Sequence, residues 1–156
     1  IMADAREGSE IVFLVDKTGS MEDDIEEVKR SINRIIDCLP PGCRLGAAAY
    51  GDNRSDGASW FSSVDLNEDY SITREFVNLI SVVGGGDIPE SVYDGIWKVL
   101  DEMSWKDCRA PDKIIVMGDA PPKTGTDTDY TVDDVLVKAK SLCPDTEFYP
   151  VIVLNL

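Results

Sequence analysis

The most informative segment of this 156-residue chain reads Ile11-Val12-Phe13-Leu14-Val15-Asp16-Lys17-Thr18-Gly19-Ser20. Five consecutive apolar residues without alternation are typical of a β-strand that is buried on both faces. Strands of this kind occur in sheets that are covered by helices on each side. The run ends at Asp16, and a short polar turn follows it. We therefore expect a central strand whose carboxyl end carries polar side chains.

Apolar strands and amphipathic helices alternate outward from this segment. Apolar residues recur at steps of three and four from Ile25 to Leu39, which predicts a helix that ends before Pro40-Pro41-Gly42. The same patterns predict further strands at 44–50, 58–64, 114–117 and 148–154, and further helices at 73–80, 92–103 and 132–142. This alternation indicates an α/β fold with an open sheet and helices on both faces. Ligands of such sheets bind beyond the carboxyl ends of the strands.

Composition excludes several classes of protein. The length fits one domain, and 43% hydrophobic residues exclude a disordered chain. No apolar run approaches the ~18 residues that a membrane-spanning helix needs, so we expect no membrane insertion. Fifteen basic against thirty acidic residues give a formal charge of −15, which disfavours nucleic acids and suits cations, basic partners or simple solubility. The chain has no histidine, so the usual general base of an enzyme is missing.

The turn after the first strand carries three oxygen-bearing side chains at alternate positions. Asp16, Thr18 and Ser20 can converge on one point if the turn is extended. A carboxylate and two hydroxyls are hard ligands that suit Mg²⁺, Mn²⁺ or Ca²⁺ rather than zinc. In the alternative interpretation, Ser20 caps the next helix with Asp23 as its capping-box partner.

Two further acids stand at the starts of later loops. Asp87 follows Gly84-Gly85-Gly86, and Asp119 follows the strand at 114–117. Asp87 could cap a helix and Asp119 could begin a turn. If the strand before Asp119 lies beside the first strand, however, the acids meet Asp16. Three neighbouring carboxylates repel one another unless a cation lies between them.

These motifs, taken together, resemble the von Willebrand factor type A domains and their metal-ion-dependent adhesion site. Asp16-Lys17-Thr18-Gly19-Ser20-Met21 is similar to the first loop of that site, and Gly85-Gly86-Asp87-Ile88-Pro89-Glu90 to the variant of the second loop in which aspartate replaces threonine. Gly118-Asp119-Ala120-Pro121-Pro122 is similar to the third loop. Tyr50-Gly51-Asp52 resembles a Tyr-Arg-Asp motif, with Gly51 in place of arginine. The combination is similar to bacterial secreted members and to the domain attached to some alpha-kinases.

The resemblance implies a fold, a site and a role. It implies a Rossmann-like, mostly parallel sheet in the order 3-2-1-4-5 with one antiparallel edge strand, over residues 11–156 after an N-terminal extension at 1–10. It implies a monomeric, non-enzymatic adhesion module that binds a protein through Mg²⁺, or Mn²⁺ or Ca²⁺. The implied ligands are Asp16, Thr18, Ser20, Asp87 and Asp119, with Asp52 as a weaker candidate behind them. Family members usually continue past the last strand; whether the domain is trimmed or minimal at Leu156 stays open.

Two details of the loops lead to expectations of their own. Asp87 in place of threonine brings a third negative charge to the ion, so we expect a tighter metal and a weaker attraction for an acidic ligand side chain. Lys17 should point away, because its ammonium would be repelled by the ion.

Under this fold all four cysteines lie at the end of the sheet opposite the metal. Disulfides Cys38–Cys43 and Cys108–Cys143, four free thiols, and a four-thiolate zinc site all stay open. Secreted relatives and the even cysteine count favour an extracellular location, and the alpha-kinase relatives favour a cytoplasmic one.

Two rival functions stay open, with one question about the ligand. A haloacid dehalogenase-type phosphatase would use Asp16 and Gly118-Asp119, but it needs a second aspartate as general acid where this chain has Thr18. A structural scaffold would keep the fold and no longer depend on metal. Trp60, Trp97 and Trp105 are scattered along the sequence, so a protein ligand is favoured over a carbohydrate.

Overall fold

A computed structural model of the chain describes residues 8–52, 56–83, 91–106, 108, 110, 112–119 and 128–152. The strands and helices that the apolar patterns predict are all present in these residues. The elements are β1 (Glu10–Asp16), α1 (Ile25–Asp37), β2 (Arg44–Tyr50), β3 (Phe61–Asn67), α2 (Tyr70–Asn78), α3 (Val92–Glu102), β4 (Lys113–Gly118), α4 (Val132–Leu142) and β5 (Glu147–Ile152), with short 3-10 turns η2 (Gly19–Met21) and η3 (Gly57–Trp60).

The strands form a single sheet in the order β3-β2-β1-β4-β5. β1 runs parallel to β2 and to β4, β4 runs parallel to β5, and only β3 at the edge is antiparallel to its neighbour. Asp16 pairs with Tyr50, and Val15 pairs with Met117. The carboxyl ends of three adjacent strands therefore meet at one edge of the sheet. The predicted α/β class, strand order and antiparallel edge strand are confirmed.

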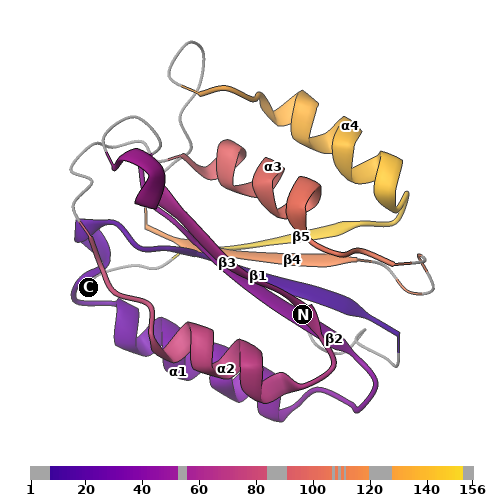
Figure 1. The fold of residues 1–156 in the computed structure, drawn as a ribbon, viewed down its shortest axis with the longest axis horizontal. Coiled ribbons are helices and arrows are strands. Elements are labelled where there is room, and N and C mark those ends of the chain that lie inside the picture. Colours follow the sequence, from indigo (N-terminus) through magenta and orange to yellow (C-terminus); the bar gives the residue numbers. More distant parts are fainter. Residues whose placement is uncertain are drawn as a thin grey trace.

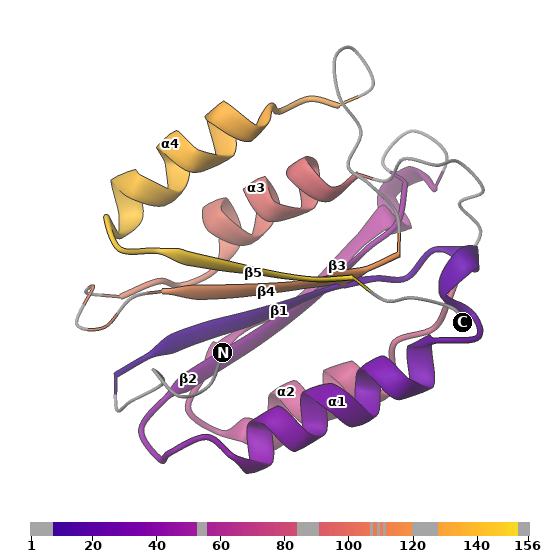
Figure 2. The same cartoon turned by 180° about the vertical axis from the view of Figure 1, so that it is seen from behind.

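Helices cover both faces of the sheet. α1 and α2 lie on one face, and α3 and α4 lie on the other (Figure 1), as the view from behind also shows (Figure 2). All seven residues of β1 are buried. Ile11, Phe13 and Val15 join the core beneath α1 and α2, whereas Val12 and Leu14 join the core beneath α3 and α4. Because burial of each such side chain stabilises the fold by roughly 1.5–3 kcal/mol, β1 needs apolar residues at every position.

Two predicted boundaries were wrong, each for a local reason. The strand expected at 58–64 begins at Phe61 instead, because Gly57–Trp60 form the η3 turn. The helix expected at 73–80 begins at Tyr70, where the side chain of Asp69 accepts a hydrogen bond from the Ser71 backbone N–H and caps the helix.

One of the two considered disulfides is present. Cys108, in the loop before β4, is bonded to Cys143 at the C-terminal end of α4. Cys38 is exposed and Cys43 is buried, and neither forms a disulfide. The Cys38–Cys43 bridge, four free thiols and the four-thiolate zinc site are therefore incorrect.

No helix in the described part of the chain is long and apolar enough to cross a membrane.

Candidate functional site

The loop after β1 is held in place by its main chain. The backbone N–H of Lys17 donates to the carbonyl oxygen of Tyr50 at 2.9 Å, and the carbonyl of Lys17 accepts from the N–H of Val83 at 2.9 Å. Thr18 and Val83 also form an isolated parallel bridge. The loop is thus fixed between the end of β2 and the segment that follows α2, so its side chains have defined positions.

Four of the predicted ligands form a continuous chain of oxygen atoms. Oδ1 of Asp16 accepts hydrogen bonds from the backbone N–H of Thr18 at 2.8 Å and from its Oγ1 at 2.6 Å. Oγ1 of Thr18 lies 3.2 Å from Oγ of Ser20, which donates to Oδ1 of Asp119 at 3.0 Å. The end of β1 and the end of β4 are therefore joined through side-chain oxygens, as the sequence predicts.

The alternative role for Ser20 as a helix cap is wrong. α1 begins at Ile25 with Asp24 as its N-cap, and no side chain there forms a cap hydrogen bond. Ser20 lies inside the η2 turn and directs its hydroxyl to Asp119 instead.

The surroundings of the Asp16 carboxyl group disfavour its charged form. The residue is 0% exposed. Burial and the negative charge of Asp119 raise the pKa of its carboxyl group, the two hydrogen bonds from Thr18 lower it, and together they give a pKa of about 6. Oδ2 of Asp16 is buried and accepts no hydrogen bond from the described residues. A buried carboxylate oxygen without a donor is an exception that needs an explanation.

Gly118 also belongs to this site, although the sequence predicts a role only for the Asp119 that follows it. A Cβ atom at this position would lie 2.8 Å from Oη of Tyr50 and 3.4 Å from Oδ2 of Asp16. The close approach leaves no room for a side chain, so glycine is required between the buried tyrosine and the carboxylate. Its position directly before Asp119 was the available signal.

The remaining candidates fall in three different places. Asp87 belongs to 84–90 and lies outside the described residues. Asp52 is buried two residues beyond β2, and its backbone N–H donates to Oδ2 of Asp56 at 2.8 Å. Nζ of Lys17 donates to the carbonyl of Ser59 at 2.6 Å, so its ammonium is held at η3, and burial lowers its pKa.

The oxygen donors at the ends of β1 and β4 suit a hard divalent cation. Among the described residues, no group of three or more histidine, cysteine, aspartate or glutamate side chains gathers to hold a metal. What gathers is two carboxylates and two hydroxyls, with one buried oxygen that lacks a donor. Hard oxygen donors of this kind fit Mg²⁺, Mn²⁺ or Ca²⁺ and do not fit zinc.

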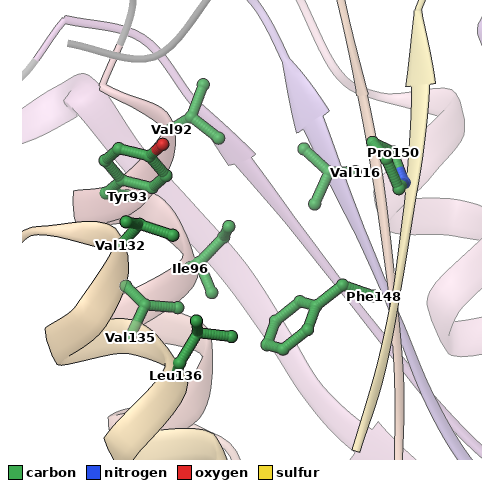
Figure 3. A pocket seen from close by; sticks show the side chains of 9 residues that line it. All are labelled: Val92, Tyr93, Ile96, Val116, Val132, Val135, Leu136, Phe148 and Pro150. Carbon is green, nitrogen blue, oxygen red and sulfur yellow. The ribbon is translucent and has the colours of Figure 1, made fainter. Parts of the chain in front are cut away.

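Two cavities border α3. One, of about 310 Å³, lies between α3, α4, β4 and β5, and it is lined by apolar side chains such as Ile96, Val135 and Phe148 that point into a common space (Figure 3). The other, of about 420 Å³, brings Trp60 and Trp97 together with Tyr130. Trp60 and Trp97, which are far apart in the sequence, therefore line one cavity.

The comparisons with known proteins agree with this fold. A sequence model described as von Willebrand factor type A domain matches residues 10–152. The structure is similar to the pilus adhesin SpaC from Lactobacillus rhamnosus GG in its open conformation, at 18% identity and a TM-score of 0.60, over 75% of this chain and 15% of that chain. It is also similar to proximal thread matrix protein 1 from the mussel byssus, at 14% identity and a TM-score of 0.74, over 97% and 39% of the two chains. No curated protein sequence matches significantly.

Proposed function

This chain belongs to the von Willebrand factor type A domains, a family of protein–protein adhesion modules, and we propose that it binds its partner through a site that depends on a divalent cation. The observation that carries this proposal is the buried Oδ2 of Asp16. It lacks a hydrogen-bond donor among the described residues and stands in a chain of oxygens that ends at Asp119. A divalent cation would supply the positive charge that these carboxylates lack.

The proposed ligands are those at the carboxyl edge of the sheet. Asp16, Thr18, Ser20 and Asp119 would hold the ion directly or through water, and Asp87 would join them. Asp52, buried at the same edge, would act behind them. The bound ion would supply a positive centre that attracts an oxygen atom of the partner. The side chains of Asp16, Thr18, Ser20 and Asp119 are already linked, each to the next, by side-chain contacts. These side chains would therefore lose little conformational entropy when the ion binds.

Three carboxylates around one ion would set the preference of the site. Two negative charges neutralise a divalent cation, and a third leaves the site net negative. We therefore propose tight metal binding with only weak attraction for an acidic side chain of the partner. Replacement Asp87→Thr should weaken Mg²⁺ binding, as measured by calorimetry. Unchanged affinity would contradict the contribution of Asp87.

The chemistry of the site supports a binding role over phosphate hydrolysis. The residue two positions beyond Asp16 is Thr18, whose hydroxyl donates to the Asp16 carboxylate. A threonine there cannot act as the general acid that a phosphatase of the haloacid dehalogenase type would need.

We place the module outside the cell, as a monomeric domain that binds a protein. The Cys108–Cys143 disulfide supports this location, because disulfides persist in oxidising compartments. The two similar structures come from a pilus adhesin and a byssus matrix protein, which supports adhesion as the context.

Thermal unfolding of metal-stripped protein tests the proposal. Titration with Mg²⁺, Mn²⁺ and Ca²⁺ should raise stability saturably, by ~2.7 kcal/mol at a hundred times the dissociation constant. Asp16→Ala should abolish the rise. Asp145→Ala is the matched control, since it removes an exposed carboxylate just before β5 and should leave the rise intact. Absence of a rise, or a rise that survives in Asp16→Ala, would identify the domain as a scaffold independent of metal.

A further inference from the structure

The cavity that contains Trp60, Trp97 and Tyr130, here called the aromatic cavity, is assembled from three separate segments. Trp60 comes from η3, Trp97 from α3, and Tyr130 from the segment that precedes α4. Phe61 pairs with Tyr50 in the sheet, so η3 lies at the same edge as the oxygen chain of Asp16. A partner bound at that edge could therefore reach the aromatic cavity as well.

The walls of the aromatic cavity are fixed before any ligand binds. The rings of Trp97 and Tyr130 stack with centroids 4.1 Å apart and planes 7° apart. Asp94 is buried on α3 and accepts hydrogen bonds from Oγ1 of Thr128 at 2.6 Å and from the backbone N–H groups of Asp129 at 3.0 Å and Tyr130 at 3.1 Å. These bonds attach the segment before α4 to α3. A preformed site of this kind loses little conformational entropy on binding.

The charge of the aromatic cavity selects for cations. Four carboxylates line it, against the ammonium of Lys98 in its wall and that of Lys138 over the Trp97 ring, so negative charge is in excess. Asp101, Glu102 and Asp129 are exposed and stand where a ligand can reach them. The chain as a whole has a formal charge of −15, which adds to the field in the same sense.

The chain's own lysines show that aromatic rings in this region accept ammonium groups. Nζ of Lys98 lies 5.5 Å from the centroid of the Phe61 ring, and Nζ of Lys138 lies 5.3 Å from that of Trp97. Their ion pairs with Glu102 at 3.3 Å and with Asp101 at 3.2 Å are solvent-exposed and therefore weak. An incoming cation can replace such pairs at little cost.

From these observations we propose that the aromatic cavity binds an arginine or lysine side chain of a partner protein, independently of any metal ion. The aromatic rings attract the cation through their electron-rich faces, and the carboxylates at the rim supply charge and hydrogen-bond acceptors. An arginine fits best, because its planar guanidinium can stack on an indole while it donates to a carboxylate.

Titration of the full chain with short peptides in the presence of EDTA tests this proposal. The probe is triarginine with both ends capped, and the neutral comparison is capped tricitrulline, which has nearly the same shape. Shifts of the indole N–H signals of Trp60 and Trp97 in NMR spectra report binding at the site. Triarginine should shift both signals saturably, and tricitrulline should bind at least tenfold more weakly.

Two charge-matched double variants separate the site from the overall charge. Asp101→Asn with Asp129→Asn should weaken triarginine binding at least fivefold, whereas Glu26→Gln with Glu75→Gln, on α1 and α2 of the opposite face, should change it less than twofold. Trp60→Ala, checked for folding by circular dichroism, should weaken binding as well.

Three results would overturn the proposal. Equal binding of tricitrulline would exclude recognition of charge, and equal losses in both double variants would reduce the effect to net charge. Binding of neutral maltotriose that the carboxylate variant leaves intact would identify a carbohydrate site instead. Because EDTA is present throughout, the result is independent of the proposed metal site, and either proposal can fail alone.

Discussion

β1 carries a buried acid at each end, and the groups that surround the two carboxylates differ. Glu10 at the amino end is 2% exposed, and Asp16 at the carboxyl end is 0% exposed. Glu10 forms an ion pair with Arg44 and accepts a hydrogen bond from the backbone N–H of Lys106 at 2.8 Å. Asp16 accepts hydrogen bonds from the backbone N–H and the hydroxyl of Thr18, and the neighbouring acid Asp119 adds negative charge instead of compensating it.

The contrast indicates where a cation from solution is needed. A buried carboxylate is tolerated when a charge of opposite sign accompanies it. At the amino end, Arg44 on the neighbouring strand β2 supplies this positive charge, so the burial of Glu10 needs no cation from solution. The described part of the carboxyl end holds no such side chain, since the nearby ammonium of Lys17 is bonded to η3. We therefore expect the stability of one end to be independent of metal and that of the other to depend on it.

The largest effect should come from removal of the positive charge of Arg44 at the amino end of β1. Arg44→Met would leave Glu10 buried without its partner, and we expect a loss of about 3–5 kcal/mol in the free energy of unfolding. Urea denaturation measures this loss, which Mg²⁺ should not restore. Arg30→Met is the control, because Arg30 pairs with Glu27 on the exposed face of α1 and should leave stability almost unchanged. Similar losses of stability in both variants would contradict the conclusion that Arg44 compensates the buried charge of Glu10.

A change of opposite sign is expected at the carboxyl end. Asp16→Asn removes a buried negative charge and keeps an oxygen that can accept the hydrogen bonds from Thr18. Metal-free protein should therefore gain about 1–3 kcal/mol in unfolding free energy, within the range for an uncompensated buried charge. The same variant should lose its response to Mg²⁺ in thermal unfolding. A destabilised variant that still responds to Mg²⁺ would contradict this assignment.

The smallest effect concerns a second acid at the amino end and depends on pH. Asp112 is 2% exposed, and its burial, together with the charge of Glu10, raises its pKa to about 7. A carboxyl group whose pKa is higher in the folded than in the unfolded protein does not lower the free energy of unfolding at a pH below the unfolded value of 3.8. As the pH rises above that value, the group lowers the free energy of unfolding increasingly, until the pH passes the folded pKa.

Asp112→Asn should therefore leave stability unchanged near pH 4 and raise it by about 1–2 kcal/mol at pH 8. Urea denaturation at pH 4, 6 and 8 measures the difference between the variant and the parent chain. Asp145→Asn, in an exposed turn, should show a flat profile. A gain that is the same at all three values would mean that Asp112 does not titrate in this range.

Sequence patterns anticipated the central part of the fold because that part obeys simple periodicity. The unbroken apolar run of β1, the spacing of Asp16, Thr18 and Ser20, and the place of Asp119 after β4 are all local signals. Each one follows from the position of a residue relative to the end of its own strand.

The contacts that escaped prediction join segments far apart in the sequence. Trp60 and Tyr130 line the same cavity only because η3 and the segment before α4 both border α3. The pair of Arg44 with Glu10 likewise depends on the parallel register of β1 and β2. No periodicity along the chain reports such contacts, because they arise when the elements pack.

The close approach at Gly118 has a consequence for the evolution of this site. A side chain at position 118 would collide with the hydroxyl of Tyr50, so the two positions are coupled through space although they lie on different strands. Relatives that keep tyrosine at the first position should keep glycine at the second, and relatives with a smaller residue at the first can vary at the second. Covariation of this pair would mark homologues in which Asp16 keeps the same buried environment, and it would distinguish them from domains that share only the sheet.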